Sequence, residues 1–330
     1  MITRKLGANG PVVSALGLGC MGMSDLYGAS DRAEGVATIH AALDAGVTLL
    51  DTGDFYGMGD NEMLIAEALR GRPRDAAILS VKFGAQRDPD GNWIGFDGRP
   101  SAVKTSLTYS LKRLGVDHLD IYRPARLDPN VPIEETIGAI ADMVKAGYVR
   151  FIGLSEVGPE TIRRAAAVHP IADLQIEYSL ISRGIEKTIL PTCRAVGIGL
   201  TAYGVLSRGL ISGHWQAQKQ TGAKDFRASI PRFQGANLDQ NLAIADEIKR
   251  VADARGATVA QVAIAWVLSR GNDIAPLVGA RRRDRLSESL GALSLTLDGE
   301  ALSALENIAN SVRGERYAKA QMSHLDSERS

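Results

Sequence analysis

Short apolar runs and longer amphipathic stretches take turns along the chain. The short runs have the length and composition of buried strands, whereas in the longer stretches the apolar positions recur at the spacing of a helix face. This alternation is typical of repeated βα units, which build a parallel sheet covered by helices. It predicts eight strands, at residues 15–20, 48–52, 77–82, 119–122, 151–154, 174–178, 200–203 and 274–278.

Helices are expected between these strands, and polar residues mark where two of them begin. Asp31 and Ser101 stand at predicted N-caps, where a short polar side chain can accept a hydrogen bond from an unpaired backbone amide. Ahead of the first strand, a turn at residues 8–11 between two apolar pieces predicts a β-hairpin. The clearest helical segments are residues 33–43, 62–69, 102–114, 133–146 and 159–168.

Charge balance and cysteine content narrow the class of protein. With 38 basic and 38 acidic residues, no net field favours nucleic acid or an anionic membrane, so the expected partners are small molecules or copies of the chain, as monomer or homo-oligomer. Cys20 and Cys193 are too few for a disulfide framework. The N-terminus lacks an apolar secretory core and no long apolar run occurs, which predicts a cytoplasmic protein.

Three residues at and near strand ends form a candidate proton-transfer group. Asp51 leaves one predicted strand, Tyr56 follows five residues later, and Lys82 ends the next strand. An ammonium stabilises a phenolate, and a carboxylate can hold that ammonium in place. We therefore expect the tyrosine pKa to be lowered from about 10 toward neutral pH, so that the phenol acts as a general acid. A structural salt bridge would have the same geometry, and only a substrate distinguishes the two roles.

These residues, with further motifs in the same order, resemble the aldo-keto reductases. The resemblance extends from Arg4 to about Asn310. It implies an α/β fold, a (β/α)8 TIM barrel with an N-terminal β-hairpin and extra helices, which binds NADPH without a Rossmann domain and reduces aldehydes or ketones. The matching segments are residues 17–22, 51–56, 61–62, 82, 120–129, 153–155, 175–178 and 279–281.

The resemblance also implies how the chain is divided and where the site lies. One barrel domain is expected over residues 1–330, with residues 1–13 as a hairpin that closes the bottom of the barrel and residues 311–330 as a C-terminal tail. In such barrels the active site forms at the carboxyl ends of the strands and in the loops that follow them. By the predicted boundaries, the residues that fall there are Asp51, Lys82, Ala125, Ser155, Gln175 and Tyr203.

Two segments are candidates for binding cofactor phosphates. Residues 17–22 fit G-x-G-x-x-G, but the next helix begins only near Asp31, so we expect a tight turn beside a ligand rather than a Rossmann fingerprint. After the last strand, the first amides of a helix that begins at Arg281 can bind an anion. The resemblance implies that Arg281 and Arg285 bind the 2′-phosphate of NADPH, that Glu288 lies near the adenine, and that Ser289 replaces an asparagine.

The other cofactor contacts rest on the resemblance. Tyr203 is expected to stack on the nicotinamide, Ser155 and Gln175 to bind its carboxamide, and the loop at residues 208–234 to cover the bound cofactor. Glu156 stands where many relatives have asparagine. The histidines share no ligand spacing, so no metal site is expected. The expected cofactor-binding residues are Met21, Gly22, Asp51, Ser155, Gln175, Tyr203, Gly204, Val205, Leu206, Arg208, Gly209, Gly279, Ala280, Arg281, Arg285, Glu288 and Ser289.

A residue that the resemblance leads us to expect is missing. Where a histidine would help to orient and polarise the substrate oxygen, the chain has Ala125, followed by Arg126. The alanine leaves three alternatives: slow turnover, a water or substrate group in the place of the imidazole, or a roomier pocket for a bulky cyclic ketone. The expected substrate pocket comprises Tyr27, Trp93, Ala125 and Arg126.

The favoured function is NADPH-dependent reduction of aldehydes or ketones, with hydride transfer to the carbonyl carbon and Tyr56 as general acid. The alternative is an NADPH-binding regulatory or sensor module with little catalysis, similar to the potassium-channel beta subunits, which also lack the histidine. No channel-docking segment is recognisable in the sequence, and a module of that kind would not need the Asp51, Tyr56 and Lys82 side chains.

Overall fold

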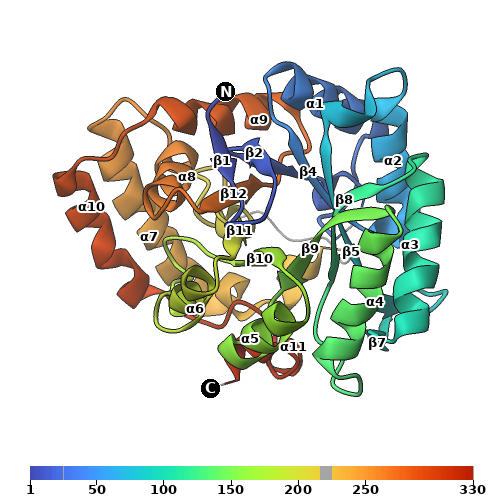
Figure 1. Ribbon diagram of the computed structural model, residues 1–330. Helices are drawn as coiled ribbons and strands as arrows, with labels where there is room; N and C mark the ends of the chain where they lie inside the picture. The colour runs from blue at the N-terminus through green and yellow to red at the C-terminus, as the bar shows by residue number, and fades with distance from the viewer. Residues whose placement is uncertain (25, 216–224, 330) are drawn as a thin grey trace.

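A computed structural model describes residues 1–24, 26–215 and 225–329, and a closed barrel of eight parallel strands forms its centre (Figure 1). Consecutive barrel strands are neighbours, and the last pairs with the first to close the ring. All eight predicted strands are present, so the TIM barrel prediction is confirmed. The barrel strands are β3 (Gly17–Gly19), β4 (Leu49–Gly53), β5 (Ile78–Phe83), β8 (Leu119–Pro124), β9 (Val149–Ser155), β10 (Ile171–Glu177), β11 (Gly199–Tyr203) and β12 (Ile274–Val278).

Helices surround the barrel on its outside, as Figure 1 shows. The five helices predicted from the sequence are found with their ends shifted by two residues or fewer. The helices are α1 (Arg32–Asp44), α2 (Asp60–Leu69), α3 (Pro100–Leu114), α4 (Ile133–Lys145), α5 (Pro159–Val168), α6 (Ile189–Ala195), α7 (Gly235–Asp253), α8 (Val259–Ser269), α9 (Arg283–Leu290), α10 (Gly299–Glu306) and α11 (Lys319–Met322). Within the described ranges, no helix has the length and apolar character needed to cross a membrane.

One of the two predicted helix caps is confirmed and the other is wrong. The Asp31 side chain accepts a hydrogen bond of 3.1 Å from the Glu34 amide at the start of α1. Ser101 does not cap α3, because that helix already begins at Pro100, with Arg99 at the N-cap position and no side-chain cap. Proline fits the first turn of a helix because its ring fixes φ near the helical value and its missing N–H is not needed there.

The bottom of the barrel is closed by the predicted N-terminal hairpin. Strands β1 (Thr3–Lys5) and β2 (Val12–Ser14) pair antiparallel. Gly7, in their connection, has a φ of +64°, and a Cβ added there would lie 2.5 Å from the Gly197 carbonyl oxygen. Only glycine allows this close approach. Apolar residues of the hairpin and the barrel form one small buried cluster: Leu6, Val13, Leu49, Ile121, Ala275 and Leu277.

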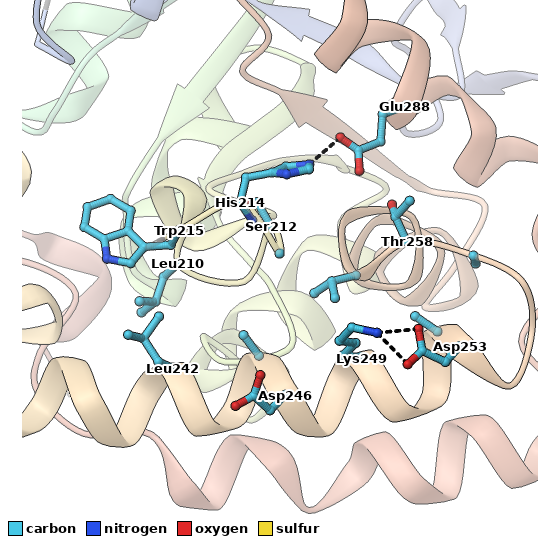
Figure 2. A pocket seen from close by; sticks show the side chains of 15 residues that line it. Leu210, Ser212, His214, Trp215, Leu242, Asp246, Lys249, Asp253, Thr258 and Glu288 are labelled. Atoms are coloured by element: carbon cyan, nitrogen blue, oxygen red, sulfur yellow. Dashed lines mark hydrogen bonds and ion pairs between the residues drawn. The ribbon is translucent and has the colours of Figure 1, made fainter. Parts of the chain in front are cut away.

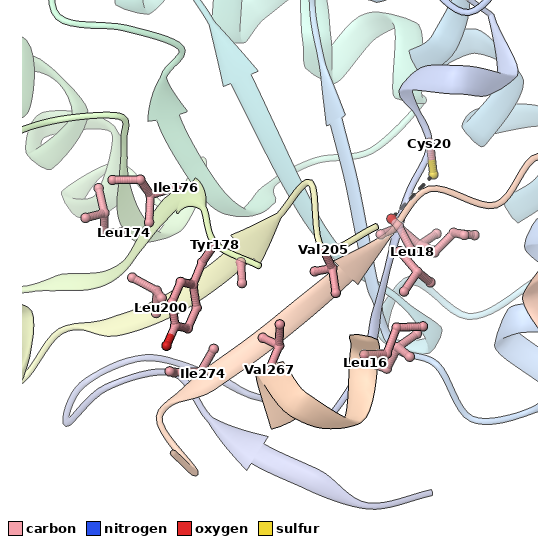
Figure 3. Close-up of a cluster of buried hydrophobic side chains, with 14 of the residues drawn as sticks. Leu16, Leu18, Cys20, Leu174, Ile176, Tyr178, Leu200, Val205, Val267 and Ile274 are labelled. Atoms are coloured by element: carbon pink, nitrogen blue, oxygen red, sulfur yellow. Dashed lines mark hydrogen bonds between the residues drawn. The ribbon is translucent and has the colours of Figure 1, made fainter. Parts of the chain in front are cut away.

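A larger apolar core lies between the strands and the helices. Leu174 and Ile176 point outward from β10 into this core (Figure 3). They alternate with Asp173, Gln175 and Glu177, which are buried on the opposite face of the same strand. Because successive side chains of a strand point to opposite faces, the upper interior of the barrel is polar while its outside is apolar. This polar interior positions the site described below.

The structure contains short elements that were not predicted from the sequence. Strands β6 (Ala85–Arg87) and β7 (Trp93–Phe96) form an antiparallel hairpin between β5 and α3. In the expected loop at residues 208–234, three 3₁₀ turns are found, and residues 216–224 lie outside the described part. These turns are Ser207–Gly209, Phe226–Ser229 and Pro231–Phe233.

Candidate active site

The predicted Asp51–Lys82 pair lies inside the barrel mouth. Lys82 Nζ is 2.5 Å from Asp51 Oδ1, and both residues are 4% exposed. The second carboxylate oxygen accepts hydrogen bonds from Ser80 Oγ at 2.9 Å and from Gln175 Nε2 at 2.6 Å. Side chains from two other barrel strands, β5 and β10, therefore hold this carboxylate of β4. Its fixed position also fixes the ammonium.

Tyr56 completes the predicted group. It begins a 3₁₀ turn (Tyr56–Gly59) directly after β4, and its ring centroid is 5.2 Å from Lys82 Nζ. The ring of Phe55 packs edge-on against it, with centroids 4.7 Å apart. Met58, in the same turn, has a φ of +53°, a conformation that non-glycine residues seldom adopt and that clusters at functional sites. The turn keeps the Tyr56 side chain in the mouth, where it is only 7% exposed.

The pKa of Tyr56 is shifted in the direction opposite to the sequence-based expectation. Burial, and then the Asp51 carboxylate, raise this pKa well above 10, while Arg126 acts in the lowering direction. Burial also lowers the pKa of Lys82. The expectation of a lowered tyrosine pKa was wrong because burial disfavours the charged phenolate and the nearby Asp51 carboxylate disfavours it further. A phenol with a raised pKa stays protonated at neutral pH, as a proton donor must.

A second buried ion pair lies beside this group and was not predicted. Arg123 Nη1 donates to Asp173 Oδ2 at 2.9 Å, and Nη2 donates to Ser80 Oγ at 2.9 Å. Both charged side chains are fully buried. At Gly153, on β9, an added Cβ would lie 2.8 Å from Asp173 Oδ1 and 3.0 Å from Arg123 Cζ. Ser80 links this pair to Asp51, so the upper interior is one connected polar network.

Ala125 and Arg126 extend β8 toward the mouth. The Ala125 amide donates to the Phe83 carbonyl at 2.8 Å, so the pairing with β5 continues one residue beyond the strand. Ile121 and Arg123 face the barrel interior, and the alternation places Ala125 on the same side. Its methyl group is covered, since the residue is 2% exposed. Arg126 Nη1 donates to the Ala125 carbonyl at 2.6 Å and to Ser155 Oγ at 3.5 Å.

The expected nicotinamide-stacking residue is tied to Glu156 and to the C-terminal tail. Tyr203 OH donates to Glu156 Oε1 at 2.6 Å and is 2.9 Å from Tyr317 OH. Glu156 is fully buried, has a φ of +53°, and accepts hydrogen bonds from both Nη atoms of Arg316, at 2.9 and 2.6 Å. Burial raises the pKa of this carboxyl, but Arg316 outweighs burial and holds the pKa well below its usual range.

The tail lies across the barrel mouth. Asp326 accepts a hydrogen bond of 2.8 Å from the Gly158 amide. Arg208 Nη2 forms an ion pair with Glu177 Oε2 at 2.8 Å, and the guanidinium carbon of Arg208 lies 4.5 Å from the ring centroid of Tyr317. Arg316 and Tyr317 were not predicted from the sequence. Glu156 offered a signal, because a carboxylate in place of an asparagine inside a barrel requires a cation from elsewhere in the chain.

The expected β11–loop residues form a tight turn beside the tail. Gly204, Arg208 and Gly209 have φ values of +66°, +57° and +97°. Val205 is buried in the outer core and Leu206 packs against it. The turn therefore brings backbone, rather than these two side chains, to the mouth.

Tyr27 and Trp93 lie at the rim of the mouth. Trp93, on β7, is 46% exposed, and its ring packs against that of Phe55 with centroids 5.7 Å apart. Tyr27 packs against Phe226 at 5.4 Å, and burial raises its pKa to about 12. A Cβ at Gly22, in the 3₁₀ turn Met21–Met23, would touch the Tyr27 ring at 3.4 Å. The glycine-rich turn therefore leaves room for an aromatic side chain of the mouth.

The basic segment after β12 differs from the expectation in one respect. Helix α9 begins at Arg283 rather than Arg281, and the Arg283 amide donates to Glu34 Oε1 of α1 at 3.0 Å. That first amide is thus engaged within the chain. Among the described residues, Arg281, which follows Gly279 and Ala280, donates to two backbone carbonyls, those of Tyr27 and Ala29, at 3.2 and 3.1 Å, and to no carboxylate. A cavity of about 670 Å³ adjoins it, lined by Ala29, Ser30, Asp31, Glu34, Arg281, Arg282, Arg283 and Asp284.

A second cavity, of about 490 Å³, lies between the loop after β11, helix α7 and the start of α8, and Glu288 near the end of α9 also lines it (Figure 2). Glu288 projects into it and is 2.7 Å from His214 Nε2. Arg285 Nη1 is 3.2 Å from Glu288 Oε2. Ser289 is buried and donates to the Arg285 carbonyl at 2.8 Å, so it does not line this cavity. The structure thus separates the predicted adenosine-end residues from the catalytic group, which belongs to the barrel mouth.

The chain forms a (β/α)8 barrel, and Asp51, Tyr56 and Lys82 lie together in its mouth, at and just beyond the carboxyl ends of β4 and β5. The aldo/keto reductase family model matches residues 15–310, and the chain belongs to the aldo-keto reductase family. Membership supports an oxidoreductase that acts on small carbonyl compounds.

Solved structures of this family resemble the chain over nearly its whole length. The glycerol dehydrogenase AKR11B4 from Gluconobacter oxydans is 30% identical, with a TM-score of 0.84 over 98% of this chain and 96% of that protein. The thermostable aldo-keto reductase Tm1743, solved with the inhibitor epalrestat, is 26% identical, with a TM-score of 0.75 over 93% and 100% of the two chains. The aldo-keto reductase AKR11C1 from Bacillus halodurans, in its holo form, shares the fold at 24% identity, with a TM-score of 0.78 over 97% and 99%.

Proposed function

We propose that the protein is an NADPH-dependent reductase of aldehydes and ketones in which Tyr56 is the proton donor. The observation that supports this most strongly is the convergence of three side chains from separate segments, with Lys82 Nζ 2.5 Å from Asp51 and 5.2 Å from the Tyr56 ring. A buried ion pair alone would be a poor stabilising device, because desolvation offsets most of its Coulomb energy. Its position beside a protonated phenol gives it a chemical use.

The residues around the mouth fit a reduced nicotinamide dinucleotide, which supplies a hydride to the carbonyl carbon when bound. Gln175 uses its Nε2 to hold Asp51, which leaves its carbonyl oxygen as an acceptor for a carboxamide. Ser155 is paired with Gln175 across β9 and β10 and presents its hydroxyl on the same side. Arg281 supplies a charge for a 2′-phosphate beside an open cavity.

The chain's own residues divide the proton chemistry between them. Tyr56 donates its proton to the carbonyl oxygen, and the phenolate that forms is stabilised by the Lys82 ammonium. Asp51 keeps that ammonium charged and in place, with Ser80 and Gln175 holding the carboxylate. The buried mouth excludes water, so these electrostatic interactions act in a low dielectric.

NADPH consumption with a panel of aldehydes and ketones tests the proposal. Tyr56→Phe is expected to lower kcat by about 100-fold or more, as for the loss of a general acid, with the NADPH dissociation constant near that of the wild type. Lys82→Met is expected to be similarly damaging, because phenolate formation loses its cation. If Tyr56→Phe kept most of its kcat, another acid would have to be found. NADPH binding without turnover of any panel member would favour the regulatory-module alternative instead.

A further inference from the structure

The structure shows how this chain binds carboxylates with arginine. Several arginines hold a carboxylate through the edge of the guanidinium that carries Nε and Nη2, the side-on fork that matches two carboxylate oxygens. Clear examples are Arg99 with Asp97, Arg164 with Glu134, Arg194 with Asp273, Arg282 with Asp284 and Arg283 with Glu34.

In Arg126 the same Nε–Nη2 edge has no hydrogen-bond partner among the described residues. Its two hydrogen bonds, to the Ala125 carbonyl and Ser155 Oγ, are both made by Nη1. Neither Nε nor Nη2 has a partner among the described residues, and neither is among their buried unpartnered atoms. The Nε–Nη2 edge therefore keeps some accessible surface, while the two hydrogen bonds of Nη1 hold the guanidinium in place.

The neighbouring cations differ from Arg126 because each already has a carboxylate partner. Lys82, Arg123, Arg208 and Arg316 each form an ion pair with a buried carboxylate, at 2.5 to 2.9 Å. No carboxylate oxygen of the described residues lies within 4.0 Å of an Arg126 nitrogen. Arg126 is thus the cation of this group that has no carboxylate of its own at ion-pair distance among the described residues. Burial disfavours its charge, but Tyr203, Tyr317 and Glu156 act on it from farther away and raise its pKa, so the guanidinium stays charged and its fork is left for an anionic ligand.

The position of Arg126 relates this fork to the reacting carbonyl. Ser155, which it contacts, is paired in register with Gln175, and Gln175 holds Asp51. The charge of Arg126 also acts on both Tyr56 and Lys82. An anion on the fork therefore sits beside the proton donor rather than at the distant adenosine end.

We propose that Arg126 binds a carboxylate of the substrate, so that the preferred substrates are oxo acids that carry a carboxylate a few bonds from the reacting aldehyde or ketone. The inference rests on the reductase function proposed above and specifies its substrate class. Arg126 is then a specificity-determining contact and not a proton donor, since arginine holds its proton too tightly to give it up.

Matched substrates test this assignment. Two aromatic acids, 4-carboxybenzaldehyde and 2-carboxybenzaldehyde, are compared with their methyl esters, and the ratio kcat/KM is measured for each compound. A hydrogen bond to a charged group contributes about 1.5–3 kcal/mol, or about 10- to 150-fold, so the wild type should prefer at least one acid over its ester by tenfold or more. Arg126→Gln should remove the preference through a higher KM for the acid, so that kcat/KM for the acid falls to within about threefold of kcat/KM for its ester in the same variant.

Two further variants and one binding measurement complete the design. Arg126→Lys keeps the charge without the fork and should retain only part of the preference, whereas the exposed Arg313→Gln removes one charge elsewhere and should retain all of it. Binding of 4-carboxybenzaldehyde to the NADPH complex, followed by titration calorimetry, should weaken at least tenfold in Arg126→Gln and be unchanged in Arg313→Gln. This measurement does not need turnover, so it reports on Arg126 even if the proposed reductase activity fails.

Three results would overturn the inference. One is a wild type that neither binds nor reduces the acids better than the esters. Another is an Arg126→Gln variant that loses acid and ester activity equally, which would assign the guanidinium to the reacting oxygen or to the fold. The third is a more than tenfold weaker NADPH affinity in Arg126→Gln, which would make it a cofactor contact.

Discussion

At the scale of single residues, position 125 holds an alanine where the resemblance to the family led us to expect a histidine. Ala125 faces the barrel interior one step above Arg123, and its methyl group is buried. An imidazole at this position would add a hydrogen-bond donor near Tyr56 and would take up space above the Arg123–Asp173 pair. A histidine at this position would therefore supply a hydrogen-bond donor for the substrate oxygen but would reduce the volume of the pocket.

Ala125→His is expected to raise kcat/KM for a small aldehyde and to lower it for a bulky cyclic ketone. The donor helps to stabilise the developing negative charge on oxygen, an effect of about 2.7–4 kcal/mol for one donor in other enzymes, whereas the added ring narrows the pocket. The ratio kcat/KM is the right measure because it reports transition-state stabilisation. If both substrates improve together, pocket volume does not explain the alanine; if neither changes, the side chain does not face the carbonyl.

Single residues also show what the sequence could and could not predict about the site. Asp51, Tyr56 and Lys82 were predictable because they lie at the ends of two adjacent strands, and parallel strands bring such ends together. Arg316 was not, because it stands 160 residues from its partner Glu156 and no periodicity links a tail to a barrel. The Tyr56 pKa was predicted in the wrong direction, since burial depends on the packed structure.

At the scale of secondary-structure elements, the barrel strands and the main helices follow from hydrophobic periodicity alone. The β6–β7 hairpin was missed because Ala85–Arg87 and Trp93–Phe96 are short and pair only with each other. The start of α9 was placed two residues early. The run of arginines at residues 281–285 does not indicate where the helix begins. The group that binds the Arg283 amide at the helix start is the Glu34 carboxylate, which belongs to α1 and is distant in sequence.

The arginine before α9, Arg281, leads us to expect that the protein prefers NADPH to NADH. Arg281→Ala is expected to weaken NADPH binding by about 10- to 150-fold, the value of one charge-assisted hydrogen bond, and to leave NADH binding unchanged. Arg281 is the relevant residue because, within the described part of the chain, its hydrogen bonds go to backbone carbonyls, whereas Arg282 is paired with Asp284. Arg282→Ala is the matched control, and fluorescence titration with both cofactors is the measurement. Equal affinities of the wild type for NADPH and NADH would contradict the assignment of Arg281 to the 2′-phosphate.

The turn between β4 and α2 contains a carboxyl that is unfavourable when ionised. Burial, and then the nearby Glu62 carboxylate, raise the pKa of Asp54 to about 7, although Arg113 opposes the shift. Because the folded-state pKa lies above the unfolded value near 3.9, the folded chain binds the extra proton. Its stability therefore falls as pH rises from about 4 to 7, and the loss is complete above that range.

Asp54→Asn is expected to remove this loss. The free energy of unfolding of the variant should exceed that of the wild type by roughly 2–4 kcal/mol more at pH 8 than at pH 4, measured by urea denaturation at both values. Asp75→Asn, at an exposed carboxyl, serves as the control and should show no such difference. A gain of equal size at both pH values would mean that Asp54 is destabilising for a reason other than its charge.

At the scale of the whole molecule, residues far apart in the chain close the barrel at both ends. The N-terminal hairpin closes the bottom with apolar side chains, and the C-terminal tail covers the mouth with charged ones. Arg316 of the tail pairs with Glu156 of the barrel and with Glu328 of the tail itself, and lies 3.5 Å from Glu177. The N-terminal hairpin therefore stabilises the bottom of the barrel by hydrophobic burial, and the C-terminal tail stabilises the mouth by a buried ion-pair network.

Arg316→Ala is expected to lower the free energy of unfolding by about 3–5 kcal/mol, because it leaves the buried Glu156 carboxylate without its cation. Arg313→Ala, three residues earlier and exposed, should change stability by no more than about 0.5 kcal/mol. The double variant Glu156→Gln with Arg316→Ala should recover a large part of the loss, since no unpaired charge then remains in the mouth. Urea denaturation of the wild type, Glu156→Gln, Arg316→Ala and the double variant gives the coupling energy between the two positions, and Arg313→Ala is measured beside them as the control. A loss in Arg316→Ala as small as that of the control would mean that the tail does not hold Glu156 in solution, and the covering of the mouth would then have to depend on bound cofactor.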